Sequence, residues 1–308
     1  SSIMNKKTLE GVDVTSGLSE KAFAENANNA RQGIIVVDLN KKLDDIGYIY
    51  YDERLAGTIR DSMYTLYDKP TSVTTNFNLE VDPNSVRSDF KFEDVTPLYL
   101  GHNEFNNTTD TEQSFNTATY TKTVTETTST SMTRGFSING KGKIFKLPLI
   151  LKEGTEVTGV FNSSDTKTTT NTETITLTAP AQNVKVPAHK KYKATTYLEQ
   201  QSYKGPVYYK AVGSNLRTNI HTKGMWIDYK GTPHTKKYQF NEDTGYCWNS
   251  LSDSGKSKVQ DITINAQSNQ MHFEGVSQAN GVFGSKLVVN IYDITDGNKL
   301  VETRKVAF

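Results

Sequence analysis

The side chains that most often carry catalysis or bind metal ions are few in this chain, and they do not cluster. Zinc sites are built from histidine and cysteine at short, regular spacings. The single cysteine, Cys247, has no histidine four residues away, and no two histidines share that spacing. The sequence therefore predicts no metal centre and no other cofactor. The five histidines are His102, His189, His221, His234 and His272.

Three short motifs resemble ligand sites but have simpler interpretations. Residues 140–143 (Gly-Lys-Gly-Lys) lack the spacing of a phosphate-binding loop and lie in a strand-like, alternating stretch. Residues 293–296 lack the twelve-residue pattern of a calcium loop and precede a hairpin-turn glycine. Acidic pairs such as Asp44-Asp45 are more typical of a solvated face than of a catalytic dyad. Because no Gly-x-Ser-x-Gly nucleophile motif is present either, we expect the protein not to be an enzyme.

The chain as a whole is long, polar and electrically balanced. Of its 308 residues, 35% are hydrophobic, and the mean hydropathy is -0.59. These values suit an elongated β protein with thin cores better than a thick α/β enzyme core. The net charge of +1 gives no field that would attract nucleic acid, so no nucleic-acid partner is expected. No stretch approaches the roughly 20 apolar residues that a membrane helix needs, and residues 1–7 do not resemble a signal peptide.

Helices are expected only in the first third of the chain. Residues 18–32 are rich in Ala, Glu and Asn and are followed by a glycine, which commonly ends a helix. Residues 52–67 carry Leu55, Ile59 and Met63 at a spacing of four, which predicts one apolar helical stripe. We therefore expect a small helical head at the N-terminal side of a mainly β protein.

From residue 72 onward, β-branched and aromatic runs bounded by turn residues predict strand after strand. Asn280-Gly281 and Asp296-Gly297 are dipeptides typical of hairpin turns. A buried strand is also expected earlier, at residues 34–37. The later expected strands are residues 73–79, 95–100, 184–186, 193–198, 207–212, 262–266, 286–294 and 300–308.

Two arms in the middle of the chain are made largely of serine and threonine. These residues account for 11 of the 17 positions in 117–133 and 10 of the 16 positions in 163–178. Threonine recurs at every second position in parts of both arms, and a period of two is the signature of a strand. A flexible linker would be rich in Gly or Pro, and neither arm contains one. The sequence predicts two long strands, each with a hydroxyl-coated face.

Residues 134–162, between the arms, alternate apolar or small side chains with polar ones, more regularly in the first half than in the second. The apolar stretch 146–152, bracketed by lysines, is expected to form the tip, and glycines 140 and 142 weaken the apolar face. The side chains expected to face lipid are Phe136, Ile138, Ile144, Leu147, Leu149, Ile150, Leu151, Val157 and Phe161. The side chains expected to face a pore lumen are Ser137, Asn139, Lys141, Lys143, Glu156 and Thr158.

This pattern is typical of a membrane β-barrel hairpin. Each half is about as long as the roughly 9–11 residues with which a tilted strand crosses a bilayer, and apolar-out, polar-in alternation is the barrel pattern. A lone hairpin in lipid would leave two rows of backbone groups unpaired, so several chains would have to close a barrel together. The alternative is an ordinary surface hairpin in a β-rich adhesin or glycan-binding surface protein whose arms form only a stalk.

Aromatic residues outside this segment are candidates for receptor contact, because Tyr and Trp combine apolar area with a polar tip. Packing within the protein is the simpler interpretation of most of them. The candidates are Tyr48, Tyr50, Tyr51, Trp226, Tyr229, Tyr246 and Trp248.

Over about residues 95–308, the chain resembles the epsilon-toxin and mosquitocidal-toxin branch of the aerolysin-like β-pore-forming toxins. Two later stretches, residues 204–207 and 262–308, are similar more loosely. Four features match in order: Thr96-Pro97-Leu98-Tyr99 before the first arm, Leu147-Pro148-Leu149 at the expected tip, Val160-Phe161-Asn162-Ser163 opening the second arm, and residues 179–188 closing it.

The resemblance implies an elongated, mainly β, three-domain fold. It implies a receptor-binding head formed by residues 1–95 and 199–255, a pore-forming middle domain at 96–198, and a C-terminal β-sandwich at 256–308. Residues 134–162 correspond to the family's insertion hairpin. The resemblance also implies secretion, proteolytic activation, binding to a receptor on a target-cell membrane, and assembly of a homo-oligomer that inserts a barrel. An insect target is an expectation by analogy alone.

Overall fold

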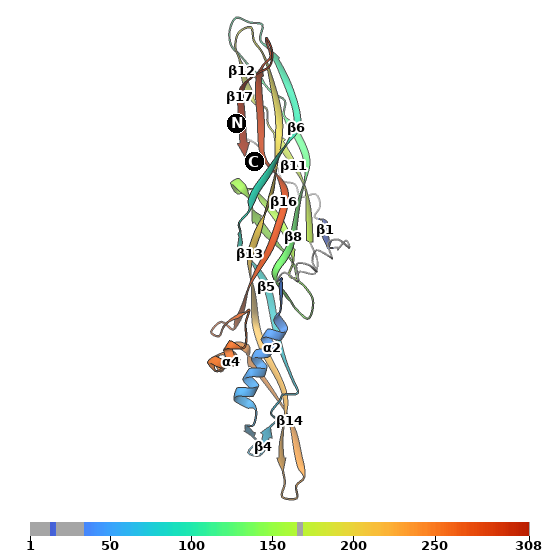
Figure 1. Ribbon diagram of the computed structural model, residues 1–308, viewed down its shortest axis with the longest axis vertical. Helices are drawn as coiled ribbons and strands as arrows, with labels where there is room; N and C mark the ends of the chain where they lie inside the picture. Colours follow the sequence, from blue (N-terminus) through green and yellow to red (C-terminus); the bar gives the residue numbers. More distant parts are fainter. Residues whose placement is uncertain (1–12, 17–33, 165–168, 308) are drawn as a thin grey trace.

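Two very long strands run through the molecule and give it its elongated shape (Figure 1). Strand β13 (Lys191–Ile227) has 37 residues and pairs antiparallel with β16 (Gln270–Asp293), which has 24. At about 3.3 Å per residue, β13 alone would extend roughly 120 Å if it were straight. In this computed structural model, which describes residues 13–16, 34–164 and 169–307, the predicted mainly β, elongated fold is confirmed.

Within the described residues, β13 and β16 form the centre of a thirteen-stranded sheet. Strands β5, β6 and β14 pair with β13, while β8, β15 and β17 pair with β16. The strands of this sheet are β1 (Asp13–Ser16), β2 (Ile35–Asp38), β3 (Ile59–Arg60), β4 (Tyr64–Leu66), β5 (Ser72–Ser88), β6 (Lys91–Asn106), β8 (Tyr120–Ser137), β11 (Thr169–Ala179), β13, β14 (Pro233–Asp243), β15 (Thr263–Asn265), β16 and β17 (Lys299–Ala307).

Two small sheets complete the β structure of the described residues. Strand β7 (Gln113–Asn116) pairs with β12 (Asn183–Val186), and β9 (Ile144–Ile150) pairs with β10 (Glu156–Asn162). At one end of the long axis lie β6, β12 and β17, and at the other lie β4, β14 and the helices (Figure 1). The expected boundary between residues 198 and 199 falls inside β13, so the three expected domains share one continuous sheet.

The helical head is built on α2 (Leu39–Tyr50), which continues as a π-helical turn, Tyr51–Leu55. The carboxylate of Asp38 caps its start by accepting a hydrogen bond from the backbone N–H of Lys41 at 3.1 Å. The apolar stripe of α2, which includes Leu39, Leu43 and Ile46, is fully buried. Two short helices, α3 (Thr244–Asn249) and α4 (Asp253–Ser257), lie at the same end (Figure 1). None of the helices in the described part of the chain is long and apolar enough to cross a membrane.

The prediction of a helix at residues 52–67 was wrong beyond residue 55. Gly57 has a φ of 74°, and Asp61 and Ser62 also have positive φ in the tight turn between β3 and β4. Ile59 and Met63 are therefore 65% and 47% exposed rather than part of a buried stripe. The spacing of four at residues 55, 59 and 63 does not mark a helix. The helix that buries an apolar face is α2, which begins after the Asp38 cap. The helix expected at 18–32 lies outside the described residues.

The other strand and turn predictions had mixed outcomes. The strand expected at 34–37 is present as β2, but of its apolar residues only Val37 is buried, and Ile35 is 45% exposed. The later expected strands are all present, mostly as parts of longer ones. The turn at Asp296-Gly297 is confirmed, with Gly297 at a φ of 136° between β16 and β17. The turn expected at Asn280-Gly281 was wrong, since both residues lie inside β16 and pair with β8 and β13.

Close tyrosine–glycine contacts explain two glycines of β16. Gly275 pairs with Tyr209 across the β13–β16 ladder, and a Cβ on it would lie 2.0 Å from the tyrosine ring. Gly281 pairs with Tyr203 in the same way, and a Cβ there would lie 2.6 Å from the tyrosine hydroxyl. A ring laid over a glycine fills space that a side chain would otherwise occupy. Glycine is therefore required at these sites by packing, and the backbone continues as a strand.

We predict that Gly275→Ala destabilises the protein by about 1–3 kcal/mol, because an added methyl overlaps the buried ring of Tyr209. The matched control is Gly284→Ala in the same strand, where the nearest atom to a new Cβ is a leucine methyl at 3.1 Å. Urea unfolding midpoints measure both variants. Equal midpoints for the two variants would contradict the role given to the tyrosine–glycine contact.

Candidate functional site

The two Ser/Thr arms are strands, as predicted, and they pair with each other. Strands β8 and β11 are antiparallel, from Thr130 opposite Thr169 to Tyr120 opposite Ala179. In β8 the even-numbered residues from 124 to 132 are buried, whereas Thr121, Thr123 and Thr125 are exposed. In β11 the even-numbered threonines lie on the more exposed face. The hydroxyl-coated face is therefore the more exposed face of the β8–β11 pair.

The inner face of the arms holds a pair of carboxylates that the sequence analysis did not single out. Glu126 and Glu173 lie directly opposite each other and are 5% and 4% exposed. The Oε1 atom of Glu126 accepts a hydrogen bond from the Gly284 N–H at 3.2 Å. The Oε1 atom of Glu173 accepts one from the side-chain amide of Asn171, also at 3.2 Å. Tyr203 lies near both, and burial raises its pKa to about 12. The period-two pattern alone identifies these positions, since they fall on the face opposite the outer threonines.

The segment between the arms contains a hairpin that belongs to a sheet of its own. Strands β9 and β10 pair from Ile144 opposite Asn162 to Ile150 opposite Glu156, and a 3-10 turn, Lys152–Gly154, joins them. No described strand of the thirteen-stranded sheet pairs with either of them. The hairpin is thus attached to the rest of the molecule by side chains and by its two ends.

Seven apolar side chains fix this hairpin to the body. The ring of Phe145 stacks on Phe161 with centroids 5.4 Å apart and packs against Tyr209 at 5.2 Å. Burial of one such side chain is worth roughly 1.5–3 kcal/mol, so exposing all seven to water would cost about 10–20 kcal/mol. The hairpin therefore leaves the body only if another apolar environment receives it. The seven are Phe145, Leu147, Leu149, Leu151, Val157, Val160 and Phe161.

The structure does not bring the expected lipid-facing residues together on one face. In β9, Leu147 and Leu149 point into the body, whereas Ile144 and Ile150 are 51% and 56% exposed on the other side. Phe136 is fully buried in β8 and packs edge-on against Phe273. Ile138 is half-buried, and Leu151, Val157 and Phe161 are buried with Leu147 and Leu149.

The reason is a chain reversal within the expected first half of the hairpin. Asn139 and Gly140 both have positive φ, 51° and 74°, the signature of a type I′ turn. Ile138 and Lys141 bond to each other on either side of it, at 2.8 and 3.0 Å. The expectation that residues 146–152 form the tip was wrong for this folded state, where β9 extends to Ile150 and the turn follows.

The expected lumen residues lie around this reversal and on the hairpin's outer side. The Asn139 N–H donates to the side chain of Asn40 in α2 at 2.7 Å, and the Lys143 ammonium donates to the Leu79 carbonyl of β5 at 2.5 Å. Lys141 and Glu156 are exposed, Ser137 ends β8 half-buried, and the Thr158 carbonyl accepts from the Asn171 amide at 2.8 Å.

Ser163, which the sequence analysis did not assign to either set of candidates, closes the base of the hairpin. Its carbonyl accepts from the Phe136 N–H at 2.7 Å, and its N–H donates to the Lys143 carbonyl at 2.9 Å. Its hydroxyl donates to the Phe136 carbonyl at 2.8 Å and accepts from the Lys143 N–H at 2.7 Å. The side chain is fully buried, and a Cβ on Gly135 would lie 1.9 Å from the Ser163 carbonyl. We call these four contacts the Ser163 clasp.

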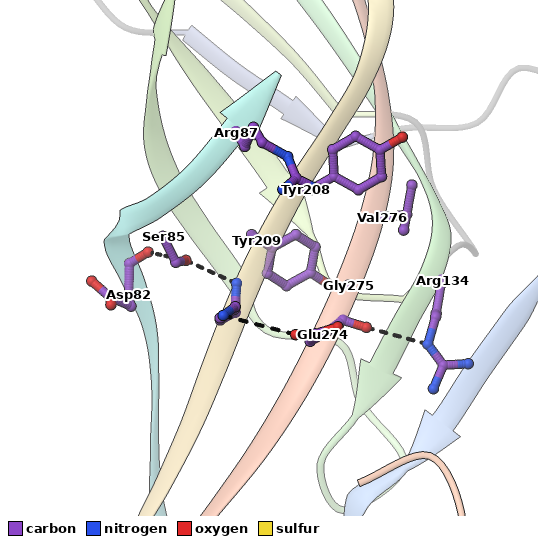
Figure 2. Close-up of a pocket in the computed structure, with 10 residues that line it drawn as sticks. Asp82, Ser85, Arg87, Arg134, Tyr208, Tyr209, Glu274, Gly275 and Val276 are labelled. Carbon is purple, nitrogen blue, oxygen red and sulfur yellow. Dashed lines mark hydrogen bonds and ion pairs between the residues drawn. The ribbon is translucent and has the colours of Figure 1, made fainter. Parts of the chain in front are cut away.

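Arg134 holds β8 just before it enters the clasp. Figure 2 shows Arg134 beside Glu274 of β16, whose carbonyl accepts from the Arg134 Nε at 3.2 Å. Arg134 also forms an ion pair with Asp261 at 3.1 Å and lies over the ring of Phe273. Burial raises the pKa of Asp261, but Arg134 and Lys42 outweigh it and hold that pKa below its usual value. An open cavity of about 760 Å³ lies beside this anchor.

The expected receptor-contact residues gather at the helical end but differ in accessibility. Tyr50 and Tyr51 are 7% and 0% exposed, and the Tyr51 hydroxyl is bonded to Thr222 at 2.7 Å, so both are core residues in this conformation. Tyr48, Tyr229 and Tyr246 are exposed, and the Tyr229 side chain is 93% exposed. Trp226 stacks on His234, and Trp248 packs partly into the core.

Comparisons with known proteins identify a matching family and solved structures of similar fold. The family model described as Clostridium epsilon toxin ETX/Bacillus mosquitocidal toxin MTX2 matches residues 71–304. The Mpp75Aa1.1 β-pore-forming protein from Brevibacillus laterosporus has a similar fold, with a TM-score of 0.58 and 19% identity, over 88% of this chain and 95% of that one. A non-toxic crystal protein from Bacillus thuringiensis is similar with a TM-score of 0.50 and 14% identity, over 83% and 96%. A search of curated proteins found no match to this chain.

We predict that Ser163→Ala loosens the hairpin by about 1–3 kcal/mol, because the buried Phe136 carbonyl and Lys143 N–H each lose a partner. Hydrogen exchange of the amides in 144–162 should become faster, while the amides of β13 keep their protection. Ser131→Ala in the first arm is the control, since the Ser131 carbonyl keeps its bond to the Ser277 hydroxyl. Unchanged exchange in the hairpin would show that the clasp does not hold it.

Proposed function

Because the chain belongs to the Clostridium epsilon toxin ETX/Bacillus mosquitocidal toxin MTX2 family, we propose that it is a secreted, non-enzymatic toxin that forms β-barrel pores. In this proposal it binds a receptor on a target cell and assembles into a ring with identical chains. Each chain then inserts the hairpin segment, residues 134–162, into the membrane. The target is an insect cell by analogy with the mosquitocidal members of the family.

The separation of the β9–β10 hairpin from the main sheet carries this proposal. Because β9 and β10 form a sheet of their own, residues 144–162 can leave without breaking a backbone ladder of the thirteen-stranded sheet. Insertion from residue 134 opens only the end of β8, where residues 134–137 pair with β2 and Arg134 pairs with Val276 of β16. In the chain the hairpin stands between the two paired arms, after β8 and before β11. A soluble precursor of a membrane hairpin needs an apolar segment that is buried while the protein is in water. The segment must also be tethered to preformed strands.

Oligomerisation follows from backbone hydrogen bonding in lipid. An inserted hairpin has two open edges, and each unpaired N–H or C=O group in the bilayer core costs several kcal/mol. Only a closed barrel pairs every group, and one chain supplies two strands. The arms would continue the barrel above the membrane, because their outer hydroxyl groups tolerate water on either side.

The other parts of the molecule take the remaining roles. Residues 1–95 and 199–255 would form the receptor-binding head, with the exposed Tyr48, Tyr229 and Tyr246 as contacts. Tryptophans 226 and 248 would support the same surface. Residues 96–198 would form the pore-forming domain, and residues 256–308 would complete a C-terminal sandwich.

Leakage assays test the proposal, and they are needed because a similarly folded crystal protein is described as non-toxic. The proteolytically treated protein should release dye from target cells or from vesicles made of their lipids. It should also yield an oligomer that resists SDS. Binding to cells without leakage or oligomer would favour an adhesin instead.

We further predict that Lys141 and Lys143 face the lumen and give the pore a preference for anions. Replacing both lysines with glutamate should shift the reversal potential in a salt gradient toward cation preference. The control is Lys185→Glu in β12, which makes a charge change of the same kind outside the expected barrel. A reversal potential that the double variant leaves unchanged would place these lysines outside the lumen.

A further inference from the structure

The two β-ladders that meet at the hairpin base are out of register. In the arms Thr130 pairs with Thr169, and in the hairpin Ile144 pairs with Asn162. Between these pairs the first strand advances fourteen residues, from 130 to 144, whereas the second advances seven, from 169 to 162. The seven extra residues of the first strand are folded aside around the Asn139-Gly140 turn.

Ser163 is the residue at which both registers meet. If the arm register is continued forward, it places Phe136 opposite Ser163, and the Phe136 N–H does bond to the Ser163 carbonyl. The hairpin register continued backward places Lys143 opposite Ser163, and the Ser163 N–H bonds to the Lys143 carbonyl. Phe136 and Lys143, seven positions apart, thus share one partner. The Ser163 hydroxyl supplies the second bond of each pair, to the Phe136 carbonyl and the Lys143 N–H.

We propose that on insertion the hairpin abandons its own register and adopts that of the arms, a slip of seven residues. This inference rests on the proposed pore function. The folded-aside loop opens, the Asn139-Gly140 turn straightens, and the first strand becomes continuous from β8 to Leu147. Ile138 then lies opposite Phe161, Lys141 opposite Thr158, and Lys143 opposite Glu156. The turn moves from residues 152–154 to residues 148–151.

The distribution of side chains on the two faces supports the arm register. Residues directly opposite each other on paired strands share a face. In the arm register the apolar or small residues Phe136, Ile138 and Ile144 share one face with Val157 and Phe161. The polar residues Ser137, Asn139, Lys141 and Lys143 share the other face with Glu156 and Thr158. Three apolar residues, Phe145, Leu147 and Val160, also fall on that face, the first two next to the new turn.

Charge pairing supports the same register. In the folded hairpin Glu156 lies opposite Ile150, and the Lys143 ammonium bonds to a backbone carbonyl of β5. After the slip, Lys143 and Glu156 lie directly opposite each other on the lumen face. Opposite charges in such cross-strand positions stabilise a sheet.

Pro148 gives a third, independent reason. In the folded state it lies inside β9, opposite Thr158. That position is tolerated in a two-stranded sheet, because a strand edge that pairs with nothing needs no N–H donor. In a closed barrel each strand is paired on both sides, so the missing N–H would leave a carbonyl unpaired in lipid. The slip moves Pro148 to the first position of the new turn, where its fixed φ is favourable.

Two cysteine pairs that share position 156 test the register, both in a Cys247→Ala background. Ile150→Cys with Glu156→Cys links residues that are opposite in the folded hairpin, at exposed positions. Lys143→Cys with Glu156→Cys links residues that become opposite only after the slip. Directly opposite residues have the spacing that a disulfide needs. The native Cys247, whose thiol is buried, is replaced so that the two introduced cysteines cannot pair with it.

The expected results differ for the two pairs. The oxidised 150–156 pair should bind cells and lose dye release, and a reducing agent should restore it. The 143–156 pair should form no disulfide in the soluble protein and should form one within a single chain in the membrane oligomer, seen by mass spectrometry of the linked peptides. Full leakage by the oxidised 150–156 pair, no linked 143–156 peptide in the oligomer, or a covalent dimer in place of the intrachain bond would overturn the slip. If the Cys247→Ala protein itself releases no dye, the pore function fails instead.

Discussion

The structure depends on the pairing of backbone hydrogen-bonding groups at the base of one hairpin. Phe136 and Lys143 compete for the same partner, Ser163. The Ser163 backbone makes one hydrogen bond to each of them, where a full strand pair would have two. The serine hydroxyl provides the two missing bonds and lets two misaligned ladders meet at a buried residue. The same requirement governs the proposed membrane state, since lipid offers no water to an unpaired group. One constraint thus shapes both the folded form and the form that would replace it.

The energetics of the hairpin match a protein that must remain inactive in water. The hairpin is held by apolar burial rather than by a ladder to the main sheet, and that burial is lost only if the side chains are exposed to water. Transfer to lipid in the arm register keeps Val157 and Phe161 out of water and covers Ile144, which is exposed in the folded form. The polar contacts to α2 and β5, made by Asn139 and Lys143, would then set the barrier to release. The long strands β13 and β16 can remain in place throughout.

The sequence predicted the periodic parts of this structure and failed where tertiary contacts decide. The period-two arms could be predicted as strands because alternation is a local signal. The dipeptide Asn-Gly occurs at 139–140, where a strand was expected, and at 280–281, where a turn was expected. Both expectations were wrong. At 280–281 paired strands on both sides and the ring of Tyr203 over Gly281 hold the chain extended. At 139–140 the neighbouring residues pair across a tight turn. Ser163 carries no local signal, since its role comes from two partners brought to it by the fold.

A cryo-electron microscopy map of the oligomer on target-cell vesicles tests the central claim most directly. The account predicts a closed barrel in which residues 136–147 and 152–163 of every chain are membrane-crossing strands continuous with β8 and β11, with β13 and β16 unchanged. A ring in which Phe145 still stacks on Phe161 and packs against Tyr209 would contradict it, because the hairpin would then never have left the body.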